Sequence, residues 1–86
     1  MNYYLIPVTI LWQAYEPTGT LRFWVRDKQN NEWVVDNCHR VQNLYWNIDL
    51  EIYHGTVHMQ PSHVCTLIID AKGRASLRYC FPRFNL

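Results

Sequence analysis

The 86-residue sequence has few of the residues from which common catalytic and cofactor-binding motifs are built. Its three glycines are too few for a phosphate-binding loop, and neither GxGxxG nor GxxxxGK[ST] occurs. The nucleophile motif GxSxG and the zinc-protease motif HExxH are absent as well. Charged residues make up only 17% of the chain, which argues against a disordered tail or a charge-rich helical bundle.

Cysteine is also scarce, with an odd number of residues, Cys38, Cys65 and Cys80, and no CxxC pair. A secreted disulfide scaffold of this size would have more cysteines and an even number of them. The apolar run near the N-terminus lacks a basic flank and is interrupted by Pro7 and Gln13, so it predicts neither a signal peptide nor a membrane span. We therefore expect a cytoplasmic protein whose reduced thiols pack as small apolar groups.

Aromatic residues, in contrast, are abundant: they form 15% of the chain and include four Trp and six Tyr. Large rings bury much area per residue, which helps a single domain of residues 1–86 to offset the entropy of folding. The same rings would suit a surface that binds another protein. The net charge of +1 does not favour a polyanion as the general partner.

Hydrophobic residues alternate with polar ones along most of the chain, which predicts strands and not helices. Turn sequences separate the strands, so we expect an all-β fold: a single small antiparallel sandwich or barrel of about six or seven strands built from hairpins. A short helix near 37–44 would make the fold α+β. The predicted strands cover residues 3–15, 20–27, 32–36, 44–53, 56–60, 63–70 and 74–81.

Two of these strands have the clearest alternation. In 3–15 one face is apolar throughout and is predicted to be buried, while Pro7 indicates an edge position or a bulge. In 44–53 the inward positions would leave Tyr45 and Tyr53 half exposed, and a turn is expected at His54-Gly55. The predicted inward positions are Tyr4, Ile6, Val8, Ile10, Trp12 and Ala14 in the first strand and Trp46, Ile48, Leu50 and Ile52 in the second.

The stretch YHGTVHMQPSHVC, residues 53–65, concentrates histidine and cysteine in a way that suggests a metal site. His54 and His58 would chelate on a helix, but the residues between them favour an extended chain, in which they lie about 13 Å apart. His63 and Cys65 share a strand face about 7 Å apart, and Cys80 on the paired strand could complete a zinc site. Core packing of this trio, with no metal or cofactor, is the simpler interpretation.

Candidate catalytic groups do not converge in the sequence. Cys38 and His39 are neighbours on an extended chain and so point to opposite faces. Asp49 and Glu51 share one face, which is typical of a solvated strand. We expect no enzyme activity.

Arginine and aromatic residues share faces in two predicted strands. Arg22, Trp24 and Arg26 alternate in one, and Arg74 and Arg78 in the other. Arginines beside rings are how small barrels bind single-stranded nucleic acid, and together these residues form that alternative site.

Trp, Tyr and Arg are also the residues that dominate protein–protein interfaces. The sequence therefore favours a protein–protein interaction module of the inhibitor, immunity or adaptor kind, whose partner protein it does not identify. The edge of the long first strand offers a route to a homodimer by strand addition. The predicted contact residues are Arg22, Trp24, Arg26, Tyr45 and Tyr53.

Overall fold

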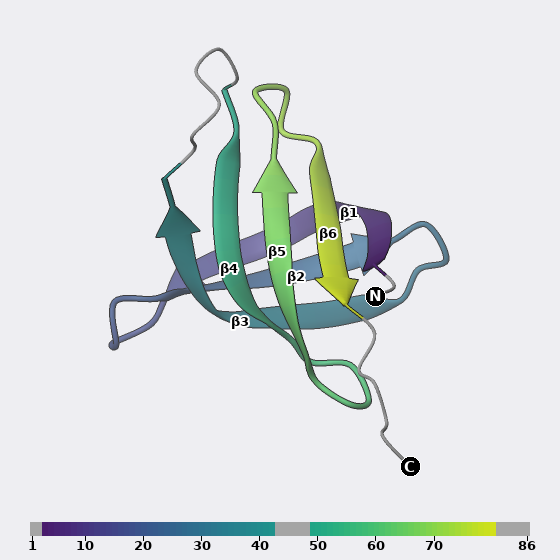
Figure 1. Ribbon diagram of the computed structural model, residues 1–86, viewed down its shortest axis with the longest axis horizontal. Coiled ribbons are helices and arrows are strands. Elements are labelled where there is room, and N and C mark those ends of the chain that lie inside the picture. The colour runs from purple at the N-terminus through teal and green to yellow at the C-terminus, as the bar shows by residue number, and fades with distance from the viewer. Residues whose placement is uncertain (1–2, 43–48, 81–86) are drawn as a thin grey trace.

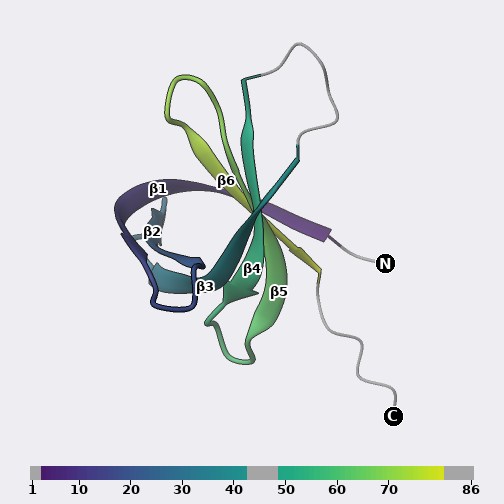
Figure 2. The ribbon, with the colours of Figure 1, turned by 90° about the vertical axis from the view of Figure 1, so that its left-hand side faces the viewer.

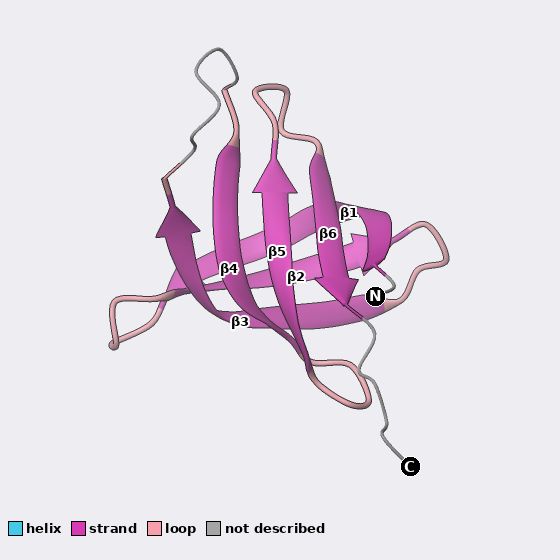
Figure 3. Cartoon of the chain, in the orientation of Figure 1, coloured by secondary structure: helices cyan, strands magenta, loops and turns pink. Residues whose placement is uncertain are grey.

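The computed structural model describes residues 3–42 and 49–80, and these form six antiparallel strands in a closed barrel. Each strand pairs with the next along the chain, and the first also pairs with the last (Figures 1 and 3). This confirms the all-β prediction and favours the barrel over the sandwich. The strands are β1 (Tyr3–Tyr15), β2 (Leu21–Asp27), β3 (Glu32–Val41), β4 (Glu51–Val57), β5 (His63–Ile69) and β6 (Ala75–Cys80).

The region near 37–44, where a short helix was the alternative prediction, is strand as far as Val41. The prediction of a helix is therefore wrong for residues 37–41. Residues 43–44 lie outside the described ranges. The same holds for Tyr45, Trp46 and Ile48, which the sequence places in a strand.

In 3–42 and 49–80 there is no helix that could cross a membrane.

The barrel closes because β1 is long and changes its partner halfway. Residues Tyr3–Val8 pair with β6, and the chain from Val8 to Tyr15 pairs with β2. Figure 1 shows β4, β5 and β6 upright in front of β1 and β2, which cross behind them, and Figure 2 shows β1 curving around the barrel. Pro7 lies opposite Ser76, in the part of β1 that has only β6 as a partner among the described strands, which fits the predicted edge position.

A β-bulge in β1 changes which of its side chains face outward. The pairing with β2 shifts between Ile10 and Trp12, so Trp12 lies opposite Trp24 on the outer surface. The predicted apolar face is thus buried at Val8 but wrong at Trp12, which is 67% exposed. An extra residue in one strand reverses the alternation beyond it, which explains the error.

Tyr53 lies inside the barrel and is only 6% exposed, so the prediction that it is half exposed is wrong. Its ring packs against Phe23, with 5.1 Å between the ring centroids. In β4 the inward positions are Tyr53, Gly55 and Val57, whereas Ile52, which the sequence placed inside, has the opposite parity. The buried apolar residues of the core are Val8, Phe23, Val25, Val35, Cys38, Tyr53, Val57, Cys65, Leu67, Ile69, Ala75 and Leu77.

Gly55 lies in the middle of β4 and not in a turn, which corrects the prediction of a turn at this point. A Cβ atom on Gly55 would lie 2.7 Å from Sγ of Cys38 and 2.8 Å from the backbone oxygen of Asp36. Both atoms belong to a bulge in β3, where Asn37 has a positive φ of 53° and the pairing with β4 shifts between Asp36 and His39. Glycine is therefore needed here to admit the bulge of the neighbouring strand.

Candidate functional site

The outer surface of β2 and β3 carries the arginine–tryptophan pattern that the sequence singled out. Phe23 and Val25 point into the core, so Arg22, Trp24 and Arg26 lie on the outside of β2, as predicted. Trp24 is paired with Trp12 of β1 on one side and with Val34 of β3 on the other. We call this surface the Trp24 face; its residues are Arg22, Trp24, Arg26, Val34, Asp36 and His58.

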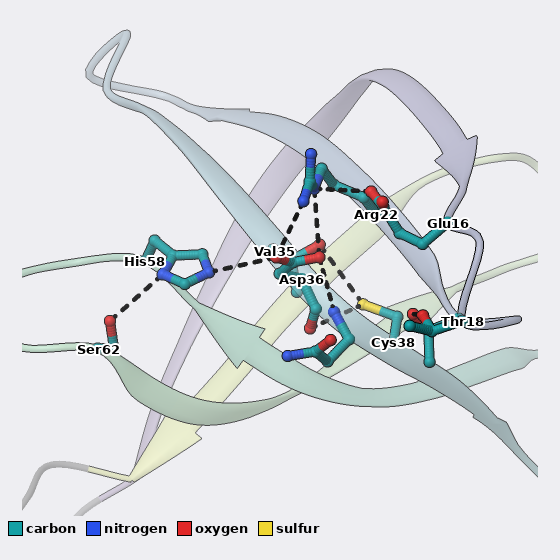
Figure 4. A network of polar contacts seen from close by, with 10 residues as sticks. Glu16, Thr18, Arg22, Val35, Asp36, Cys38, His58 and Ser62 are labelled. Carbon is teal, nitrogen blue, oxygen red and sulfur yellow. Dashed lines mark hydrogen bonds and ion pairs between the residues drawn. The ribbon is translucent and has the colours of Figure 1, made fainter.

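Two carboxylates hold the guanidinium of Arg22 in place (Figure 4). Nε and Nη2 of Arg22 donate to Oδ1 and Oδ2 of Asp36, both at 3.2 Å, and Nε also lies 2.9 Å from Oε1 of Glu16. The guanidinium carbon lies 5.8 Å from the ring centroid of Trp24. Arg22 is therefore fixed by a two-pronged carboxylate contact and by the adjacent aromatic ring.

Asp36 has its position because of the β3 bulge. The N–H of Asn37 donates to Oδ1 of Asp36 at 2.9 Å, and the S–H of Cys38 reaches the backbone oxygens of Val35 and Asp36 at 3.6 and 3.8 Å. Gly55 leaves the space that this arrangement occupies. The geometry of the Trp24 face thus depends on a glycine on another strand.

The contact with Arg22 lowers the pKa of Asp36, chiefly through the side-chain hydrogen bond, and it raises the pKa of Arg22. The folded state therefore favours the charged form of Asp36. The resulting stabilisation is complete above the ordinary pKa of an Asp side chain, and it is lost as the pH falls through the lower pKa that Asp36 has in the folded protein.

We predict that Asp36→Asn lowers the free energy of unfolding at pH 7. Below about pH 4 the free energy of unfolding should then fall less steeply with decreasing pH than it does in the wild type. Urea denaturation at a series of pH values measures both effects. The exposed Asp49, which lies outside the contacts of Arg22, is the control: Asp49→Asn should leave the wild-type pH profile in place. An Asp36→Asn profile that keeps the full acid decline would contradict the assignment.

His58 extends the same set of contacts toward the β4–β5 turn (Figure 4). Its Nε2 lies 3.7 Å from Oδ2 of Asp36, and its Nδ1 lies 3.4 Å from Oγ of Ser62. The order Ser–His–Asp is that of an acyl-transfer triad, but both distances exceed the 2.6–3.2 Å that proton transfer requires. Asp36 also already accepts two bonds from Arg22. His58 is thus part of the Trp24 face through its contact with Asp36.

The buried thiols are poor nucleophiles. Burial raises the pKa of Cys38 to about 12 and that of Cys65 to about 11, so both stay protonated near neutral pH.

A shallow groove of 230 Å³ opens beside the Trp24 ring. Ligand pockets for small molecules usually have about 300–1,000 Å³, so this groove suits a single protein side chain better than a cofactor. Its lining residues are Trp24, Glu32, Trp33, Val34 and His58.

The five residues of the nucleic-acid alternative do not form one surface. Arg78 lies opposite Leu5, near the start of β1, whereas Arg22 lies opposite Ala14, near its end. Arg74 belongs to the β5–β6 turn, where its Nε donates to Oδ2 of Asp70 at 3.0 Å.

Three of the four arginines in this alternative set face carboxylates. Arg22 and Arg74 make the contacts described above, and Nη2 of Arg26 lies 3.7 Å from Oε1 of Glu32. Arg78 instead stacks 4.3 Å above the ring centroid of Tyr3, in a groove of 350 Å³ that also includes His54. Carboxylates so close to the cations reduce the attraction for phosphate.

The residues of the zinc alternative lie in the first half of β5 and at the end of β6. His63 and Cys65 are buried on one face of β5, and Cys65 packs in the core, as predicted. The residue opposite Cys65 is Tyr79, and not Cys80, whose side chain lies outside the described part. Within that part, no group of three or more His, Cys, Asp or Glu residues is placed to hold a metal ion.

The sequence did not point to Trp12, Glu16 or Asp36 as parts of a site, and it suggested His58 only as half of a metal-chelating pair with His54. Glu16 comes near Arg22 because Glu16 begins the turn between β1 and β2 and Arg22 lies near the start of β2. Their closeness in the sequence was a usable signal. The other three depend on bulges and on pairing between strands, which no local pattern reveals. Comparison of the chain with models of known protein families, with curated proteins and with solved structures gave no match.

Proposed function

We propose that this protein is a non-enzymatic protein–protein interaction module that binds its partner through the Trp24 face. The observation that carries the proposal is the fixed arrangement of Arg22 beside the Trp24 ring, on an outer surface that also displays Trp12. Trp and Arg are the residues most enriched among binding hot spots. A guanidinium that is already held in place loses little side-chain entropy when a partner binds.

The groove beside Trp24 indicates how the partner would dock. An apolar side chain of the partner fits against Trp24, Trp33 and Val34, while Arg22 and Asp36 on the same face offer a charged donor and acceptor for hydrogen bonds. An apolar centre with a polar rim is the usual anatomy of a protein interface.

The charges on this surface favour a protein over a nucleic acid. Arg22 and Arg26 are balanced by Glu16, Asp36 and Glu32, so the Trp24 face lacks the cationic excess that phosphate binding requires. Inhibitors, immunity proteins and adaptors are compact single domains that act through such a surface, and we place this protein in that class.

Capture of the partner by immobilised protein tests the proposal. Trp24→Ala should weaken binding by about 30-fold or more, the loss typical of a hot-spot residue. Arg22→Lys keeps the charge but removes the two-pronged contact with Asp36, and it should weaken binding as well. The matched control is Val64→Ala, which removes an apolar side chain that is 76% exposed on β5.

Three results would count against the proposal. A protein captured equally well by wild type and by Trp24→Ala does not bind through this face. Loss of capture with Val64→Ala alone would move the binding surface to β5. Salt-sensitive binding of a labelled 20-nucleotide single strand, abolished by Trp24→Ala, would replace the protein partner with nucleic acid.

A further inference from the structure

The second half of β1 is an open edge of the sheet. Residues 9–15 pair with β2 on one side, while the pairing of β1 with β6 ends at Val8. No other strand in 3–42 or 49–80 pairs with this half of β1. Figure 1 shows this half of β1 running behind the upright strands. The barrel is thus closed by one half of β1, and the other half has a free edge within the part of the chain that the structure describes.

Side chains of both parities are exposed along this edge. Leu11 is 37% exposed, Trp12 67% and Tyr15 81%, and Gln13 is exposed although it pairs with the buried Phe23. In β2 the residues of one parity are buried, and the strand at 9–15 lacks this one-sided burial.

This edge has only one of the features that usually prevent strands from associating. Natural edge strands carry Lys, Pro or other charged groups that block pairing with another chain. Residues 9–15 include no charged residue and no proline, and Pro7 precedes them. The bulge at Leu11 is the one such feature in the segment, and it bends the strand without adding charge.

We propose that residues 9–15 of β1 pair antiparallel with the same residues of a second copy of this chain, which forms a two-fold symmetric dimer. A two-fold contact requires a segment that fits itself. Because the segment is neutral, every antiparallel register brings together residues without like charges, and the rings of Trp12 and Tyr15 from each copy cover the other's strand. Backbone hydrogen bonds between the two copies then use N–H and C=O groups of residues 9–15 that pair with no strand in the described ranges.

The dimer contact uses the edge of β1 and not the Trp24 face, so it does not rest on the proposed function. Trp12 lies beside Trp24 on the outer surface. Pairing of the two β1 edges would therefore bring the two Trp24 faces into one continuous sheet surface.

Sedimentation equilibrium of the purified chain tests the proposal. Protein concentrations from about 1 to 300 µM cover the dissociation constants expected of a weak dimer. The wild type should shift from monomer to dimer across this range. Leu11→Lys/Gln13→Lys puts two positive charges on each edge and should raise the dimer dissociation constant by about tenfold or more. The control is Val64→Lys/Gln29→Lys, which makes the same kind of change at an exposed aliphatic residue and an exposed glutamine away from the edge.

A dimer that only the edge variant weakens supports the proposal. A wild type that stays monomeric throughout, an edge variant that dimerises as well as the wild type, or a control that weakens the dimer equally would each overturn it. Far-UV circular dichroism checks that the variants are folded. Should the double variant fail to fold, Gln13→Lys alone, compared with Gln29→Lys, gives the same comparison.

Discussion

Gly55→Ala should lower the free energy of unfolding by about 2–3 kcal/mol, because the added methyl group has no room between β3 and β4. It would meet Sγ of Cys38 at 2.7 Å and the backbone oxygen of Asp36 at 2.8 Å. A side chain can rotate away, but the carbonyl of Asp36 belongs to the bulge and moves only with the strand. Thermal and urea denaturation measure the loss.

The same substitution should also disturb the Trp24 face. Displacing the bulge moves Asp36, and with it the carboxylate that holds Arg22. We therefore expect Gly55→Ala to weaken partner binding under conditions in which the variant is still folded.

Cys38→Ala, alone and combined with Gly55→Ala, provides the control. Removing the sulfur takes away one of the two close contacts. Gly55→Ala should therefore lower the free energy of unfolding less in the Cys38→Ala background than in the wild type. Equal costs in both backgrounds, or a Gly55→Ala protein as stable as the wild type, would contradict the close approach.

Tyr53→Ala should destabilise the protein by about 3–5 kcal/mol, the loss expected when a large buried ring is removed. Tyr53 is 6% exposed and packs on Phe23, and burial raises the pKa of its hydroxyl. A domain of 86 residues has a total stability of about 4–13 kcal/mol, so this variant would lose much of its folded population.

Tyr53→Phe is the matched control because it keeps the ring, and it should change the free energy of unfolding by less than about 1.5 kcal/mol. If Tyr53→Ala were as stable as the wild type but failed to bind the partner, the sequence-based assignment of Tyr53 to the binding surface would be right and the buried position wrong.

Much of the fold follows from local sequence patterns. In β2, charged and aromatic residues alternate with Phe23 and Val25, so the outward position of Arg22, Trp24 and Arg26 was predictable. The turn between β5 and β6 was predictable too, because Gly73 separates two alternating segments of the sequence, and in the structure Gly73 has the positive φ of 80° that glycine allows.

The errors have a shared physical origin in contacts between strands. Around Leu11 consecutive residues are all apolar, so nothing local reveals the bulge that turns Trp12 outward. In the sequence Gly55 resembles a turn residue, whereas in the structure it makes room for the bulge in β3. The contact between Arg22 and Asp36 likewise depends on how β2 and β3 pair, which the alternation in each strand does not specify.

Photo-crosslinking is the most direct test that the Trp24 face binds a partner protein. Benzoylphenylalanine at position 26, at the rim of the face, should crosslink the partner, and Trp24→Ala should abolish that crosslink. The same probe at position 64 on β5 should give none. A crosslink from position 64 and none from position 26, or a crosslink at position 26 that persists in Trp24→Ala, would contradict the assignment.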